Sequence, residues 1–224
     1  MKIKILKNGP YLVTGDVPLS EKIIVRKGKH NEWEQGRELP QSQTYSLCRC
    51  GKSKTPPFCD GTHAAAHFEG TETASRAPYS KRITDKVEGP GVTLLDDGRC
   101  AYARFCHRDK GDVWQLTDRS DNPELRDGAI KAATDCPAGR LTMLDKNGEA
   151  IEPELAPSIE ILQDPGEGVS GSIYVKGNIP IESSDGSTYE IRNRVTLCRC
   201  GKSRNKPFCD AMHVNMKYSD GHVK

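Results

Sequence analysis

The sequence has few of the residues that build a large hydrophobic core. Of its 224 residues, 35% are hydrophobic and only 6% are aromatic, which is little for one core that extends through the whole chain. No apolar run approaches the ~18 residues of a membrane span, and residues 1–6 alternate like a strand, so we expect no targeting segment and no membrane contact. These absences predict a soluble cytoplasmic protein of one to two ordinary domains, whose polar units are stapled by prosthetic groups.

A dominant charge of one sign is also missing. The 33 Lys and Arg residues nearly balance the 31 Asp and Glu residues, which leaves a formal net charge of +2. No polybasic stripe of the kind that binds nucleic acid is present. The chain also lacks a recognisable Ser-His-Asp constellation, phosphate-binding loop or paired-carboxylate pattern, so we do not expect an enzyme.

One cysteine-rich string, in contrast, occurs twice with the same spacing. Both copies read C-x-C-x8-C-x3-H, they lie 150 residues apart, and they agree at 12 of 17 positions. The ligand candidates of the first copy are Cys48, Cys50, Cys59 and His63, and those of the second copy are Cys198, Cys200, Cys209 and His213. Three thiolates and one imidazole form a closed set of four ligands, so each copy predicts a metal site.

The ligand types alone leave zinc and iron–sulfur open, because Cys3His is also an accepted zinc set. However, one residue between the first two cysteines and an eight-residue gap do not match the usual C-x2-4-C zinc sites. Disulfides are the weakest interpretation, since nine cysteines is an odd number and nothing indicates an oxidising compartment. Since the ligand types suit zinc as well, a zinc-stabilised interaction module remains an alternative to an iron–sulfur protein.

The string resembles the CDGSH iron–sulfur (mitoNEET-like) family. The resemblance rests on Cys-x-Cys, the following Ser, Pro-x-Cys-Asp and a His four residues after that Cys. It implies one [2Fe–2S] cluster per copy, with the two cysteines of the C-x-C on the inner iron and the last Cys and the His on the outer iron. The first copy has Thr62 where the family has Ser, and the second has Ala211 in place of Gly, so the loop before His213 is expected to differ.

The local sequence suggests how the ligands are presented. Cys59 and His63 are four residues apart, which places both on one face of a helical turn. Asp60 stands where a helix N-cap is expected, and Ala64 to Ala66 are good helix formers. Basic residues flank both copies, either as a solvated loop or as a docking surface for a partner: Lys52, Lys54, Lys202, Arg204 and Lys206.

A second repeat precedes each copy. Residues 9–19 align with residues 171–181, and the first repeat carries 12 extra residues, which we place between Asn31 and Gln43. Two such strand-rich units are expected to pair face to face, as a monomer with internal pseudo-two-fold symmetry. We expect CDGSH-type units at residues 1–75 and 166–224, separated by a divergent ferredoxin-like domain at residues 76–165.

The middle segment predicts an α+β sandwich of the ferredoxin type. Strands are expected at residues 92–94, 113–116 and 141–143, and a helix from Pro123 to Thr134 with Asn122 as N-cap. Its three cysteines are Cys100, Cys106 and Cys136, where Cys136-Pro137 resembles the end of a ferredoxin motif. Three cysteines suit a [3Fe–4S] cluster, whereas a [4Fe–4S] cluster needs a fourth ligand, for which His107 is the nearest candidate. A domain that lost its metal is the alternative.

The sequence thus predicts an iron–sulfur protein with two [2Fe–2S] clusters and one [3Fe–4S] or [4Fe–4S] cluster. The expected function is proton-coupled electron transfer with redox partner proteins. The alternative is storage and delivery of clusters to apo-protein acceptors.

Overall fold

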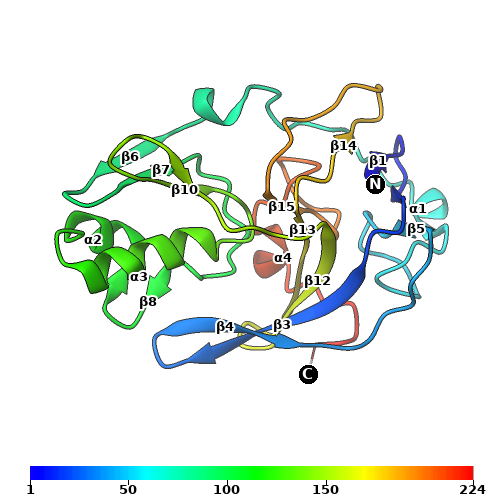
Figure 1. Cartoon of the computed structure of the whole chain (residues 1–224). Helices are drawn as coiled ribbons and strands as arrows, with labels where there is room; N and C mark the ends of the chain where they lie inside the picture. Colours follow the sequence, from blue (N-terminus) through cyan, green and yellow to red (C-terminus); the bar gives the residue numbers. More distant parts are fainter. Residues whose placement is uncertain (224) are drawn as a thin grey trace.

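The computed structural model describes residues 1–223 and shows a mixed α+β chain with many short strands and few helices (Figure 1). This confirms the expected α+β class. The elements of the first part are β1 (Lys2–Ile5), β2 (Tyr11–Thr14), β3 (Leu19–Lys27), β4 (His30–Gln35), β5 (Thr44–Leu47) and α1 (Thr62–Ala65). Those of the last part are β12 (Ser158–Asp164), β13 (Val169–Lys176), β14 (Ile181–Glu182), β15 (Arg194–Leu197) and α4 (Met212–Asn215).

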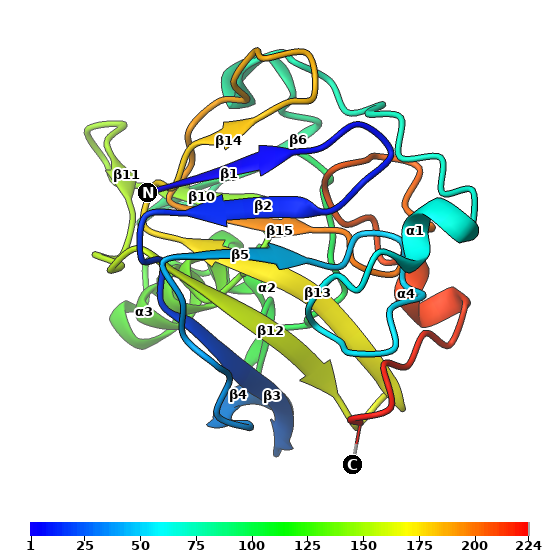
Figure 2. The same cartoon turned by 90° about the vertical axis from the view of Figure 1, so that its right-hand side faces the viewer.

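The first and last parts exchange strands. In one sheet, of order β14-β1-β2-β5, β14 pairs in parallel with β1. In the other, of order β15-β13-β12-β3-β4, β3 pairs in parallel with β12. Figure 2 shows β1, β2 and β5 side by side, with β12, β13 and β3 forming the second sheet beneath them. Each part therefore completes the sheet of the other.

One hydrophobic core fills the space between these two sheets. It includes Ile3 and Val13 from the first part and Ile161, Ile173 and Leu197 from the last, all at most 1% exposed. Alternate residues of each strand point into it, as in β1, where Ile3 and Ile5 are buried. Because both parts contribute, a chain with few apolar residues still closes a common core.

β12 lies before residue 166, where the second CDGSH-type unit was expected to begin. It pairs antiparallel with β13 along most of its length. In the last part, β12 therefore pairs with β13 as β1 pairs with β2 in the first part. The domain boundaries themselves stay a prediction.

The extra residues of the first repeat extend a strand hairpin. β3 has nine residues and turns into β4, whereas β14, at the matching place, has two. The hairpin packs on the middle segment, because Trp33 stacks on Phe105 with ring centroids 4.2 Å apart. The side-chain amide of Asn31 also donates to the carbonyl of Ala103 at 2.9 Å.

The middle segment has a four-stranded sheet with two helices against it. The sheet order is β11-β10-β7-β6, from β6 (Asp85–Glu88), β7 (Thr93–Asp96), β10 (Leu141–Leu144) and β11 (Ala150–Ile151). The remaining elements are the 3-10 turn η1 (Tyr79–Lys81), the small hairpin β8 (His107–Arg108) and β9 (Gly111–Asp112), and the helices α2 (Val113–Asp118) and α3 (Pro123–Thr134). The strands at residues 92–94 and 141–143 are confirmed to within a residue or two. Helix α3 is confirmed with its bounds, and the Asn122 side chain accepts bonds from its first turn.

The strand expected at residues 113–116 is wrong, because this segment is helix α2. Asp112 and Gln115 form a reciprocal capping box, in which each side chain bonds the backbone N–H of the other. Val113, Leu116 and Thr117 are buried at helical spacing. Within residues 1–223, no helix has the length and apolar character needed to cross a membrane.

Candidate metal centres

The structure brings the eight ligand candidates of the two copies together as four pairs. The Sγ atoms of Cys48 and Cys50 are 3.8 Å apart, and those of Cys198 and Cys200 are 3.7 Å apart. The Sγ of Cys59 is 3.3 Å from Nδ1 of His63, and the Sγ of Cys209 is 3.4 Å from Nδ1 of His213. Two ligands of one tetrahedral ion are separated by about 3.8 Å for two thiolates and about 3.5 Å for a thiolate and an imidazole. Each pair is thus spaced to hold one ion.

The pairs do not merge into single four-ligand sites. Among residues 1–223, no three side chains of His, Cys, Asp or Glu converge closely enough to share one metal ion. A structural zinc site requires four donors around one point. Two separate pairs in each copy fit a binuclear group better than one zinc ion.

Backbone pairing holds the ligands in place. Beyond β5, the N–H of Cys48 donates to Pro57 O at 2.8 Å, and the N–H of Cys59 donates to Ser46 O at 2.9 Å. The second copy repeats both bonds, from Cys198 to Pro207 O and from Cys209 to Thr196 O, at the same distances. The loop between the paired cysteines and the third cysteine therefore folds back on its own strand.

The turn before each helix is the same in both copies, so the expected difference before His213 is wrong. Gly61 has φ 85° and Ala211 has φ 68°, both in the left-handed region. These residues, rather than Asp60, occupy the N-cap positions. Asp60 instead accepts bonds from the N–H groups of Lys54 and Thr62, which hold its pKa well below the ordinary range.

The arginine between the paired cysteines is a residue that sequence reasoning missed. Arg49 and Arg199 are each 2% exposed. Arg49 donates to the carbonyls of Leu6, at 3.2 Å, and Gly70, and Arg199 donates to those of Leu162 and Gly171, both at 2.8 Å. Arg49 thus ties its cysteine loop to the turn after β1, and Arg199 ties its loop to strands β12 and β13. Its identical place in both copies was the available signal.

The two copies touch each other at two glycines. A Cβ added to Gly51 would lie 2.5 Å from the carbonyl oxygen of Cys200, and one added to Gly201 would lie 2.5 Å from that of Cys50. Tyr11 adds a further link, because its hydroxyl donates to Cys198 O at 2.8 Å. Nothing larger than glycine fits at these reciprocal contacts.

The two copies differ in burial. Cys209 and His213 are each 3% exposed, whereas Cys59 and His63 are partly exposed. Burial, together with the nearby Arg199 charge, lowers the pKa of His213 to about 4. Burial likewise raises the pKa of the Cys209 thiol. Equal ligand sets therefore stand in unequal surroundings.

The three middle cysteines lie close enough to influence one another. Burial, together with the charges of Cys136 and Cys100, raises the pKa of Cys106 to about 12. Arg194 of β15 holds the Cys136 loop, donating to the carbonyls of Ala133, Thr134 and Cys136 at 2.7–2.8 Å. These thiols do not share one ion, but they could surround a larger cluster.

The structure does not bring His107 to these cysteines. Its side chain is exposed and lines a surface hollow with Arg26 and Lys29, in which none of the three cysteines takes part.

The Cys100 loop lies against the second copy. The guanidinium of Arg99 stacks on the Phe208 ring at 4.5 Å. The Cys100 thiol is near enough for its charge to raise the pKa of Cys209. The middle cysteines thus neighbour the second copy, and the second copy touches the first.

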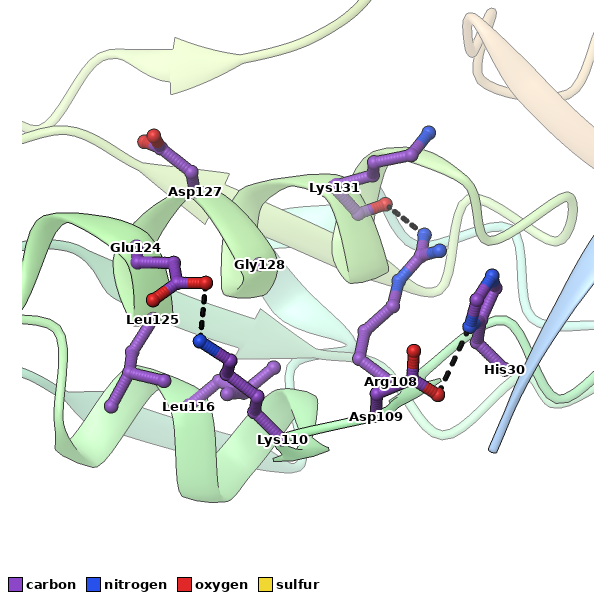
Figure 3. A pocket seen from close by; sticks show the side chains of 10 residues that line it. All are labelled: His30, Arg108, Asp109, Lys110, Leu116, Glu124, Leu125, Asp127, Gly128 and Lys131. Carbon is purple, nitrogen blue, oxygen red and sulfur yellow. Dashed lines mark hydrogen bonds and ion pairs between the residues drawn. The ribbon is translucent and has the colours of Figure 1, made fainter. Parts of the chain in front are cut away.

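A hollow of about 320 Å³ between the β3–β4 hairpin and the helices α2 and α3 contains none of the cysteines. Figure 3 shows three pairs among its lining residues: Lys110 with Glu124, His30 with Asp109, and Arg108 with the carbonyl of Lys131. We assign no site to it.

Comparisons with known protein families agree with this geometry. The family described as iron-binding zinc finger, CDGSH type, matches residues 8–64 and 170–214. The family described as divergent 4Fe–4S mono-cluster matches residues 87–146 between them. No curated protein and no solved structure matches the chain. The matched ranges contain every ligand candidate named above.

Proposed function

Because the chain carries two segments of the CDGSH family around one of the divergent 4Fe–4S family, we propose that it is a multi-cluster electron carrier rather than a catalyst. The observation that carries this proposal is the contact between the loops that bear the three cysteine sets, through Arg99 and Phe208 on one side and Gly51 and Gly201 on the other. Clusters placed in such a row supply one-electron storage when bound.

The donor sets fit two [2Fe–2S] clusters and one larger cluster. Cys48, Cys50, Cys59 and His63 would hold the first, and Cys198, Cys200, Cys209 and His213 the second. Cys100, Cys106 and Cys136 would hold a [3Fe–4S] cluster, or a [4Fe–4S] cluster with a ligand from solvent or elsewhere. Buried arginines beside each set favour the negative charge of thiolate ligands.

The two CDGSH-type units form an intramolecular pseudo-dimer in this proposal. The exchange of β3 and β14 between the sheets and the matched contacts of Gly51 and Gly201 both support it. Such reciprocity is the mark of a two-fold interface. A single chain then needs no second copy to complete either site.

Proton coupling is proposed at the first copy. His63 faces Cys59 with Nδ1, which leaves Nε2 free, and the side chain is partly exposed. A negative charge added nearby favours a proton on that nitrogen. The midpoint potential of this site should therefore fall with rising pH, by up to ~59 mV per unit for one proton and one electron.

The test is a stepwise reduction of anaerobically purified protein, followed by absorbance and electron paramagnetic resonance. An electron carrier takes up and returns electrons reversibly at three distinct centres. A colourless protein without iron would point to the zinc-stabilised module and end the proposal.

Delivery of clusters to apo-proteins is the second candidate, favoured by the partly exposed Cys59 and His63. Incubation with an apo-ferredoxin separates the two functions, because only a donor loses its absorbance to the acceptor.

A further inference from the structure

The two CDGSH copies share their ligands and loop bonds but not their surroundings. Four corresponding residues are more covered in the second copy: Ser203, Phe208, Cys209 and His213 are buried, whereas Ser53, Phe58, Cys59 and His63 are partly exposed. Of the flanking basic residues, Lys52 and Lys54 in the first copy and Lys202 and Arg204 in the second are all exposed. Asp60 and Gly61 are exposed, while Asp210 and Ala211 are partly covered. Comparing the two copies therefore shows how the neighbouring segments change the exposure of one and the same set of ligands.

The cover over the second copy comes from the middle segment and the linker that leads to it. Arg99 covers Phe208, and the N–H groups of Thr73 and Ala74 both donate to Lys206 O, at 2.8 and 2.9 Å. Figure 1 shows α4 between the middle segment and the sheets, with α1 at the opposite edge of the molecule.

Arg104 links the middle segment to the last part of the chain. It reaches from the Cys100–Cys106 loop to Asp164 at the end of β12, with two hydrogen bonds of 2.7 and 2.9 Å. The Asp164 side chain is 2% exposed and that of Arg104 17%. A two-point bond to a buried carboxylate resists opening more than a surface ion pair does. Both residues lie close enough to His213 to act on its charge.

The first copy, whose ligands are partly exposed, also carries positive charge that forms no ion pair. Lys52 and Lys54 are exposed, and within residues 1–223 neither ammonium group forms an ion pair. The neighbouring Asp60 carboxylate is occupied by two backbone N–H groups. A negatively charged surface would therefore be attracted to this rim.

We propose that the first CDGSH copy is the port through which electrons pass to and from an acidic partner protein, and that the second copy is an internal relay closed by the Arg104–Asp164 clasp. This inference rests on the proposed electron-carrier function. Electrons would pass from the middle cysteines to the second copy, then to the first copy, and from there to a partner bound beside Lys52 and Lys54.

The first test uses ferricyanide as an anionic probe of the port. A reduced centre gives up one electron, and ferricyanide becomes ferrocyanide. The double variant Lys52→Glu/Lys54→Glu should slow this oxidation by about fivefold or more at low salt, with the difference shrinking as salt is added. The matched variant Lys202→Glu/Arg204→Glu makes the same change on the second copy and should alter the rate less than twofold. Equal slowing by both variants, or no slowing by either, would overturn the port assignment.

The same experiment separates this inference from the function on which it rests. Protein that cannot be reduced at all contradicts the electron-carrier proposal before any variant is compared. The cation hexaamminecobalt(III) gives a check on the sign of the effect, because Lys52→Glu/Lys54→Glu should speed its reaction rather than slow it.

The second test is hydrogen exchange of the holoprotein. It measures how the Arg104–Asp164 pair limits local opening, and it needs no redox step. Arg104→Gln should raise the exchange rate of the amides in residues 209–218 by about tenfold, towards the rate in residues 59–68. Arg37→Gln is the matched control, since it also removes an arginine from a buried carboxylate, Glu21, which is 2% exposed. If Arg104→Gln fails to fold, Arg104→Lys, which keeps the charge and loses the two-point bond, should show a smaller rise. Unchanged exchange in residues 209–218 in a folded variant would refute the clasp.

Discussion

Adding one methyl group at Gly51 tests the contact between the two copies. Gly51 has φ 72°, and a Cβ there would lie 2.5 Å from the carbonyl oxygen of Cys200, closer than two such atoms can approach. The left-handed backbone costs an alanine about 1–2 kcal/mol, and forcing the two loops apart costs about 1–3 kcal/mol more. Gly51→Ala should therefore lower the free energy of unfolding by about 2–5 kcal/mol.

Two further variants isolate the contact. Gly61 has φ 85° but no atom within 4 Å of an added Cβ, so Gly61→Ala should cost only the backbone term of about 1–2 kcal/mol. Gly201→Ala makes the reciprocal clash with Cys50 O, also at 2.5 Å, and should match Gly51→Ala. Because both open the same interface, the double variant should cost less than the two single costs together. Denaturant unfolding followed by circular dichroism measures all four, and equal costs for Gly51→Ala and Gly61→Ala would refute the contact.

Three other expectations follow from the sites. Replacing Cys100, Cys106 and Cys136 by Ser should remove the larger cluster and leave the [2Fe–2S] spectrum intact, and unchanged iron content would mean that the middle segment binds no metal. His107→Ala should leave the iron content unchanged, because the side chain is exposed and lines a surface hollow that contains none of the cysteines; loss of one cluster would restore it as a ligand. In the metal-free protein, the pKa of His213 is about 4 in the folded state and ordinary, near 6.5, when unfolded, so the folded state binds fewer protons between these values. The free energy of unfolding should therefore fall by roughly 2 kcal/mol from pH 7 to pH 5. His213→Gln should remove this fall. Equal stability of the wild-type protein at both pH values would contradict the burial of His213.

The sequence predicted which candidate ligands of the two copies lie together, because their spacing is local. Cys59 and His63 meet across one helical turn, and the folded-back loop between Cys50 and Cys59 is set by the residues within it. Helix α3 was predictable for the same reason, since Asn122 and Pro123 mark its start. The apolar residues of the 113–116 segment suggested a strand, and the capping box of Asp112 and Gln115 was the local signal that would have corrected it.

Features that depend on distant residues were not predictable. The exchange of β3 and β14 joins residues far apart in the sequence, Leu19 with Ile159 and Ile3 with Ile181. Arg194 belongs to β15 by sequence but holds the loop of Cys136. The unequal burial of His63 and His213 depends on how distant segments pack around each copy, which no comparison of the two strings could reveal.

The central claim is that one chain holds two CDGSH-type clusters and a third cluster bound by the middle segment. Mössbauer spectroscopy of anaerobically purified, iron-57-labelled protein, combined with iron and acid-labile sulfide counts, tests it most directly. The account predicts about eight iron atoms per chain for a middle [4Fe–4S] cluster, or about seven for [3Fe–4S], with two Cys3His [2Fe–2S] components of unequal outer iron sites. A single iron component, or zinc in place of iron at the two copies, would contradict it.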